Sequence, residues 1–415
     1  MKGTQVFAIR SFTAFLVARF CLTFAFQVQA VTMSLEVYEI TGDALSLGLA
    51  GLFEAIPFMA VILPAGLWAD VYRRKHLILI TSSLFICCAI ILYLLSVEAF
   101  GEITPKLLLL YMVIGMTGLA RGIAGPAVQA TIPNLLPRDL LPQGVAWNTS
   151  FWQVASIAGP AVGGLLYGYF GKESSYLVSM ISSSCALLAF SLLPNLKPSH
   201  IRNESMVNSL LTGIRFVRKQ RLILSALSLD LFAVLFGGAV ALLPVFNAEI
   251  LKAGPDGLGI LRSAPSIGAV ITAFLLARNP PLKNSGRTLL LSVGAFGVCM
   301  IAFALSEYFW LSFIILLLSG LFDGVSVLIR STIVQLYTPD EMRGRVSSVN
   351  SIFIGSSNEI GAFESGLAAK WLGLVPSVIF GGFMTIGITS LMATFAPKLR
   401  KLQLGDQFKK QVDVS

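Results

Sequence analysis

The chain has 415 residues, of which 55% are hydrophobic and only 12% are charged, and its formal net charge at pH 7 is +9. Its mean hydropathy is +0.81. A soluble protein of this length could not keep enough polar surface in water, so the composition excludes a soluble globular chain and indicates a membrane protein. The excess positive charge suits contact with anionic lipid headgroups, so we expect the lipid bilayer, and no nucleic acid, as a partner.

Twelve long apolar stretches follow one another along the chain. A bilayer core of about 30 Å is crossed by about 20 apolar residues in a helix. The stretches cover 11–37, 44–68, 76–97, 107–131, 142–168, 174–194, 222–248, 257–278, 287–305, 309–333, 346–368 and 374–396. Because they lack the alternation typical of membrane strands, the sequence predicts an all-α membrane protein with twelve transmembrane helices.

Positively charged residues set the expected orientation. If both termini are cytoplasmic, the N-terminal tail, the even-numbered loops and the C-terminal tail contain most of the 30 Lys and Arg residues. The outer loops then contain Lys106, Lys172, Lys252 and Lys370. Loops rich in Lys and Arg stay on the cytoplasmic side of a membrane. We therefore expect a multi-pass membrane protein with both termini in the cytoplasm.

The longest polar interruption divides the stretches into two sets of six. We assign residues 1–194 to an N-terminal bundle, 195–221 to a cytoplasmic linker with an amphipathic helix, 222–396 to a C-terminal bundle and 397–415 to a cytoplasmic tail. Two loops echo each other at a constant offset, since Leu135, Asp139, Val145 and Ser150 match Leu336, Asp340, Val346 and Ser351. A duplicated six-helix unit predicts such a repeat, and chance similarity of two loops is the alternative.

A short charged loop joins the second and third stretches. It reads Gly66-Leu67-Trp68-Ala69-Asp70-Val71-Tyr72-Arg73-Arg74-Lys75. The Asp70 carboxylate can meet the positive N-terminus of a neighbouring helix, while the arginines hold the loop at the cytoplasmic surface. The run resembles the loop between helices two and three of the major facilitator superfamily, although Tyr72 and Arg73 stand where that family has a small or basic pair. The resemblance implies two pseudo-symmetric six-helix bundles that rock around a gating loop formed by Gly66, Asp70, Arg73 and Arg74.

Eight ionisable residues are noted inside the predicted helices. They are Arg19, Glu54, Arg121, Asp230, Asp323, Arg330, Glu359 and Glu364. Each costs about 2.5–3.5 kcal/mol near the bilayer centre, so as a set they predict a polar transport pathway, with structural pairs or surface positions as the alternative for any single one. We expect intramembrane charge pairs to involve Arg19, Glu54, Asp323 and Arg330. Asp323 and Arg330 are about 10 Å apart along one helix, so we expect them to pair with neighbouring helices and not with each other.

Proton coupling is assigned to Arg121, Asp230, Glu359 and Glu364. Arg121, followed by Gly122 and Gly125, resembles the fourth-helix arginine pattern of the superfamily, in which a buried cation is implied to couple proton movement to substrate release. Glu359 and Glu364 lie among small residues that allow close helix contact, and carboxylates in dry surroundings hold protons readily. We expect Glu359 or Asp230 to be the protonation site. The alternative is that Glu359 and Glu364 anchor loops at the membrane surface.

The fifth stretch contains the run Gly159-Pro160-Ala161-Val162-Gly163-Gly164. A proline removes a backbone hydrogen bond and bends a helix, and glycines allow the helix to press against a partner. Gly159, Pro160, Gly163 and Gly164 match a pattern typical of superfamily antiporters, which implies efflux in exchange for protons. Ala146 and Ala155 stand where that pattern has glycine, and a packing kink is the alternative.

Three runs of the second half resemble the bacterial branch that contains enterobactin (siderophore) exporters and macrolide efflux proteins. They are Asp230–Gly238, Gly254–Gly259 and Thr338–Val346. The resemblance covers nearly the whole chain and implies a secondary active transporter of the bacterial inner (plasma) membrane that exports a small amphipathic molecule, siderophore or drug-like. We expect a monomer with no cofactor or metal. An importer or lipid transporter of the same fold, and a non-transporting membrane sensor, are the alternatives. We expect no enzyme, because no nucleophile with a base and no metal cluster can be assembled.

Overall fold

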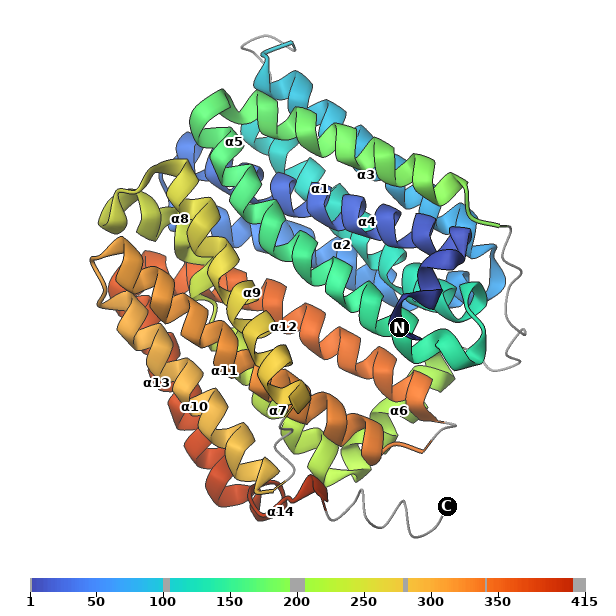
Figure 1. The fold of residues 1–415 in the computed structure, drawn as a ribbon. Helices are drawn as coiled ribbons and strands as arrows, with labels where there is room; N and C mark the ends of the chain where they lie inside the picture. The colour runs from blue at the N-terminus through green and yellow to red at the C-terminus, as the bar shows by residue number, and fades with distance from the viewer. Residues whose placement is uncertain (1, 100–104, 195–205, 279–282, 340–341, 406–415) are drawn as a thin grey trace. The chain divides into compact units, whose positions relative to one another are not determined.

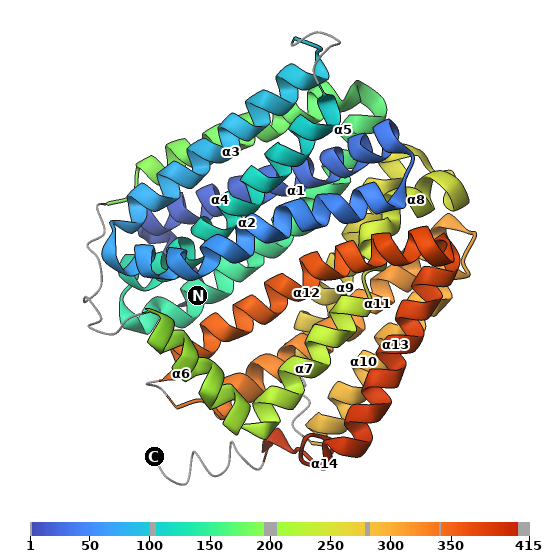
Figure 2. The same ribbon diagram turned by 180° about the vertical axis from the view of Figure 1, so that it is seen from behind.

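The structure is a computed structural model that describes residues 2–99, 105–194, 206–278, 283–339 and 342–405 (Figures 1 and 2). Within these ranges the chain forms helices and no strand. Backbone contacts divide it into two compact units. Unit 1 comprises Met1–Met206 and Lys252–Ser263, and unit 2 comprises Val207–Leu251 and Ala264–Ser415.

The long helices of unit 1 lie side by side as a bundle in both views (Figures 1 and 2). They are α1 (Arg10–Thr41), α2 (Ala44–Val71), α3 (Arg74–Ser96), α4 (Lys106–Leu135) and α5 (Leu141–Ser191). Gly171 interrupts α5 with φ 82° and ψ 168°, a backbone conformation that glycine adopts without a steric penalty. The fifth and sixth expected spans therefore lie on either side of Gly171.

The helices of unit 2 also form a bundle, and its described elements begin with α6, whose basic face agrees with an amphipathic helix. Arg215, Arg218 and Lys219 are exposed, whereas Val217 is buried. The elements are α6 (Met206–Lys219), α7 (Arg221–Phe236), α8 (Leu243–Phe246), α9 (Gly254–Arg278), α10 (Ser285–Ala304), α11 (Phe309–Leu336), α12 (Arg343–Leu372), α13 (Leu374–Phe395) and α14 (Pro397–Arg400). The first residues of α9 belong to unit 1.

Each of the twelve expected spans lies on one or more described helices. Within the described ranges, ten helical segments are long and apolar enough to cross a membrane. One of them, Gln143–Ser191, contains both spans that flank Gly171. α12 is not among the ten, but its length covers the expected span 346–368. For the described residues, the prediction of an all-α membrane protein is confirmed.

The seventh expected span is not one helix. α7 ends at Phe236, and after Gly237 and Gly238 the chain continues as a 3-10 helix, the short α8 and a π-helix over Asn247–Leu251. Small residues of α12 pack on the broken end, since a Cβ on Gly361 would lie 3.0 Å from the Leu235 carbonyl oxygen. The expected span 222–248 lies within the membrane-capable segment Arg221–Leu251, and its helix is broken at Gly237 and Gly238 because two consecutive glycines weaken a helix.

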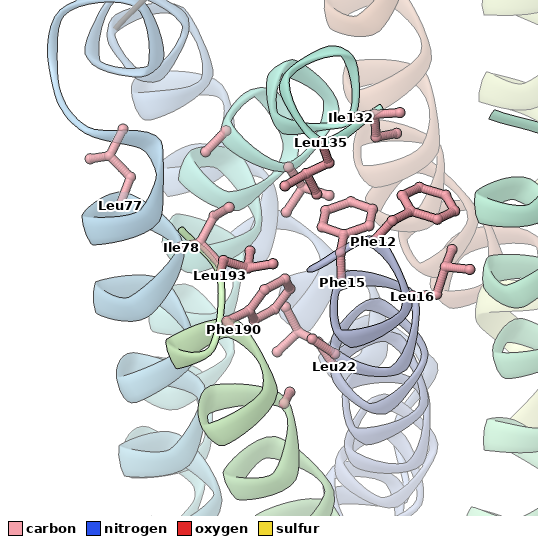
Figure 3. Close-up of a cluster of buried hydrophobic side chains, with 14 of the residues drawn as sticks. Phe12, Phe15, Leu16, Leu22, Leu77, Ile78, Ile132, Leu135, Phe190 and Leu193 are labelled. Atoms are coloured by element: carbon pink, nitrogen blue, oxygen red, sulfur yellow. The ribbon is translucent and has the colours of Figure 1, made fainter. Parts of the chain in front are cut away.

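Buried apolar clusters hold each unit together near one end. In unit 1, side chains from α1, α3, α4 and the end of α5 meet (Figure 3). The labelled members are Phe12, Phe15, Leu16, Leu22, Leu77, Ile78, Ile132, Leu135, Phe190 and Leu193. The cluster of unit 2 includes Leu399, Leu402 and Leu404, so the beginning of the expected tail 397–415 packs into this unit. Residues 406–415, like 195–205 of the expected linker, lie outside the described residues.

Candidate functional site

An ion pair in unit 1 joins α4 to α2. Arg121 Nη1 of α4 contacts Glu54 Oε1 of α2. Gly122, one residue further along α4, allows the two helices to approach, because a Cβ there would lie 2.5 Å from a methyl carbon of Val61. Neither partner is fully exposed, with 32% of the Arg121 side chain and 17% of the Glu54 side chain accessible. Both expected intramembrane charges are therefore compensated by each other.

Two aromatic rings also surround the Arg121 guanidinium. Its central carbon lies 4.8 Å from the ring centroid of Phe26 of α1 and 5.5 Å from that of Phe58 of α2. The negative face of an aromatic ring attracts a cation at such distances. Three helices of unit 1 thus hold one guanidinium in place.

Arg19 of α1 differs from Arg121. Among the described residues no carboxylate lies within ion-pair distance of Arg19, and its buried Nε has no hydrogen-bond acceptor. Arg19 and Phe26 are seven residues apart, so they share one face of α1. The expected charge pair of Arg19 is therefore absent from the described part of unit 1.

Arg330 of α11 is the centre of a charge network in unit 2. Its Nη1 contacts Asp230 Oδ1 of α7, its Nη2 lies 3.8 Å from Asp323 Oδ1, and its Nε donates a hydrogen bond of 3.3 Å to the Ser326 carbonyl oxygen. Only 9% of the side chain of Arg330 and 9% of that of Asp230 are exposed, against 48% for Asp323. The network ties α7 to α11 and employs every nitrogen of the guanidinium.

The expectation that Asp323 and Arg330 make no direct contact is wrong. It used the rise along the helix axis and ignored the direction of the side chains. Long side chains on a helix point back toward its N-terminus, so Arg330 extends toward the turn that carries Asp323. The pairing of Arg330 with another helix, through Asp230, agrees with the expectation.

The structure describes the side chain of one of the two glutamates of α12. Glu364 is half-buried and forms no ion pair with another described residue. Glu359 lies in the same helix, but its side chain is outside the described part of the structure. The assignment of either to proton coupling stays a prediction.

The loop between α2 and α3 is fixed by its basic residues. Arg74, which is buried, donates a hydrogen bond of 3.1 Å from Nε to the Ala69 carbonyl oxygen and one of 2.6 Å from Nη1 to the Ala130 carbonyl oxygen. Cations near the C-terminal ends of helices are favourable, and Ala69 and Ala130 lie near the ends of α2 and α4. Gly66 and the backbone of Asp70 lie in α2, and Arg73 is exposed at the start of α3. The Asp70 side chain lies outside the described part of the structure.

The glycine-rich run of α5 presses this helix against two others. A Cβ on Gly159 would lie 2.5 Å from Cβ of Gln27 in α1, and one on Gly163 would lie 3.1 Å from Cα of Val28. Gly164 faces the beginning of α9, where a Cβ would lie 2.6 Å from Cα of Gly259. The backbone remains helical through Pro160. These glycines serve close packing inside unit 1, and no contact of the structure tests their role in exchange.

A polar cluster near the end of α1, in which Glu36 and Tyr176 are buried, was not anticipated. Glu36 accepts hydrogen bonds from Lys172 Nζ at 2.9 Å and from the Tyr176 hydroxyl at 2.5 Å, both of which follow Gly171 in α5. Glu39 accepts a hydrogen bond of 2.5 Å from the Tyr167 hydroxyl, which precedes Gly171. The end of α1 is therefore bonded to both halves of α5. A signal existed, because Glu36 lies inside the expected span 11–37 and belongs among the intramembrane ionisable residues.

The sequence is similar to a known family and to curated proteins. A family model described as transmembrane secretion effector matches residues 4–411. The enterobactin exporter EntS of Escherichia coli O1:K1 is 26% identical over 394 residues, which are 95% of this chain and 93% of that protein. The protein of the same name from Shigella boydii serotype 18 is 25% identical over 393 residues, with the same coverages.

Solved structures share the fold. A D-xylose–proton symporter superposes with a TM-score of 0.74 at 13% identity, over 95% of this chain and 99% of that chain. A bacterial homolog of the human lysosomal transporter Spinster, in an inward-facing and unoccupied conformation, gives 0.70 at 13% identity, over 97% and 98%. At such identities the likeness shows the fold alone, and it confirms the expected major facilitator fold. These proteins and the curated relatives are transporters and not enzymes.

Proposed function

This chain belongs to the transmembrane secretion effector family of the major facilitator superfamily, and from that premise we propose that it is a proton-coupled exporter of a small amphipathic molecule. The cargo is a siderophore or a drug-like compound. The proposal depends on the charge networks inside the helices, Arg121 with Glu54 in unit 1 and Arg330 with its two aspartates in unit 2. Ionisable groups inside membrane helices usually serve a substrate or proton pathway.

The direction of transport is supported by the relatives and by one motif. Proteins named enterobactin exporters match 95% of this chain. The run from Gly159 to Gly164 resembles the antiporter pattern and packs tightly against α1 and the start of α9. Export in exchange for protons is consistent with both observations.

The movement of protons across the membrane can drive export without hydrolysis of a nucleotide. One positive charge that crosses 100 mV releases about 2.3 kcal/mol, which supports roughly a 50-fold gradient of a neutral cargo. In the proposed cycle, two bundles rock by alternating access, and the loop from Gly66 to Lys75 opens and closes through the Asp70 carboxylate. We propose a bacterial inner-membrane location, and the distribution of Lys and Arg supports an orientation with both termini in the cytoplasm. The working unit is proposed to be a monomer.

Everted membrane vesicles test the proposal. Cells that overproduce the protein provide vesicles whose interior is acidified by respiration, and enterobactin and a macrolide serve as probes. An exporter accumulates one of these probes inside the vesicles and loses it when a protonophore removes the pH gradient. Uptake only into right-side-out vesicles would instead favour an importer. A non-transporting sensor predicts no accumulation in either type, and normal function after neutralisation of Asp70, Arg121 and Glu359.

A further inference from the structure

The charges around Arg330 do not balance. One guanidinium faces two carboxylates, those of Asp230 and Asp323, so the group carries a net charge of −1 when both are ionised. An uncompensated charge inside a membrane protein is unfavourable. Binding of one proton makes the group neutral.

The geometry distinguishes the two carboxylates. Asp230 contacts Arg330 directly, and both side chains are only 9% exposed. A proton on Asp230 would remove the close partner of a buried guanidinium. Asp323 lies 3.8 Å from Nη2, and 48% of its side chain is exposed. A proton on Asp323 would leave the buried contact between Asp230 and Arg330 intact.

The ionisable groups around Asp323 also favour a proton on Asp323 over a proton on Asp230. Arg330 is the ionisable group that the described structure brings within ion-pair distance of Asp323. The packed helices contribute few other ionisable groups: Arg221 and Asp230 on α7, Arg278 from residues 264–278 of α9, and Arg287 and Cys299 on α10. Glu364 on α12 has no ion-pair partner among the described residues, so its protonation would not alter a charge network. Protonation of Asp323, in contrast, removes one of the two ion pairs of Arg330, the one within α11, and leaves the one with α7.

We propose that Asp323 is the residue that binds and releases the coupled proton, with Asp230 as the permanent counter-ion of Arg330. This inference rests on the proposed proton-coupled export and changes its expected protonation site from Glu359 or Asp230 to Asp323. With Asp323 ionised, Arg330 is held by α7 and by its own helix. With Asp323 protonated, Asp230 is the one carboxylate that pairs with Arg330, and the hydrogen bond to the Ser326 carbonyl oxygen remains. The proton thereby switches one contact of α11 while the α7–α11 connection is retained.

Infrared titration of the purified full-length protein in liposomes tests the assignment without a cargo. A protonated carboxyl group has a C=O stretching band that a carboxylate lacks. We expect a band that appears as the pH falls in the wild type, that is absent from Asp323→Asn, and that returns at a shifted frequency in Asp323→Glu. Glu364→Gln is the matched control and keeps the Asp323 band. Asp230→Asn moves the band to lower pH, because Arg330 then pairs with Asp323 alone.

Transport in the same liposomes separates this inference from the proposed function. With enterobactin and a macrolide as probes, Asp323→Asn should still exchange labelled for unlabelled probe but should lose accumulation driven by a pH gradient, so that the ratio of internal to external probe falls to one. Full band amplitude in Asp323→Asn, or wild-type accumulation by it, overturns the assignment. If the wild type accumulates neither probe while the Asp323 band titrates, the proposed export of these compounds fails and the proton assignment stands.

Discussion

Neutralisation of Glu36 should destabilise unit 1 far more than neutralisation of a similar but exposed glutamate. In the Glu36–Lys172 pair the Nζ–Oε1 distance is 2.9 Å, and 5% of the Glu36 side chain and 28% of the Lys172 side chain are exposed. In the Glu98–Lys106 pair the distance is shorter, 2.7 Å, but 65% and 35% are exposed. The two pairs have the same chemistry, so burial is the main difference between them.

The expected magnitude follows from what each substitution leaves behind. Loss of one member of a buried ion pair costs about 3–5 kcal/mol. Glu36→Gln should fall at the lower end of that range, because Lys172 is partly exposed and the glutamine can still accept a hydrogen bond from Tyr176. Glu36→Ala also leaves the buried Tyr176 hydroxyl without an acceptor, which adds about 1–3 kcal/mol. Glu98→Gln should have no measurable effect, since exposed pairs are screened by water.

Thermal unfolding of the purified variants in mild detergent, followed by tryptophan fluorescence, gives the comparison. Because two units can unfold separately, the order of apparent melting temperatures is the measured quantity. We expect the wild type and Glu98→Gln to have the same, highest melting temperature, Glu36→Gln a lower one, and Glu36→Ala the lowest. If Glu36→Gln and Glu98→Gln melt together, burial does not determine the contribution of these pairs and the reasoning is refuted.

Three further predictions concern other parts of the chain. Asp70→Asn should abolish turnover in a transport assay while the protein is still made; wild-type turnover would exclude a gating role. Gly164→Ala should lower stability by about 1–3 kcal/mol in a melting experiment, because its Cβ meets backbone, whereas Gly125→Ala, with open space around it, should not. Equal melting of the two variants would argue against close packing there. Arg121→Lys should reduce the transport rate, since an ammonium cannot reproduce the planar fork of a guanidinium; an unchanged rate would contradict this.

The spans and the charged residues inside them could be predicted from the sequence, because both follow from the cost of placing polar groups in lipid. The ion-pair partners of these charged residues were harder to predict. Glu54 and Arg121 lie on helices whose proximity depends on Gly118 and Gly122, and a sequence alone does not show which helices are neighbours. Arg19 was expected to be paired, but the described residues place no carboxylate within ion-pair distance of it, and a paired and an unpaired arginine have the same sequence signal.

The contact between Asp323 and Arg330 and the end of α7 depend on local geometry, which a search for apolar stretches does not consider. Side-chain direction brings Arg330 back to Asp323 across seven residues, although the axial distance argues against contact. Gly237 and Gly238 end α7 inside a stretch that is apolar enough to be one span. In both cases local geometry, and not hydrophobicity, determines the outcome.

Simultaneous measurement of cargo and proton movement tests the carrier assignment most directly. Purified protein is reconstituted in liposomes with an acidic lumen and an enclosed pH-sensitive dye, and enterobactin or a macrolide is added outside. Proton-coupled export predicts that one probe enters while the lumen becomes more alkaline, at rates that fall together in Asp323→Asn. Probe entry without proton exit, or neither movement with either probe, would contradict it.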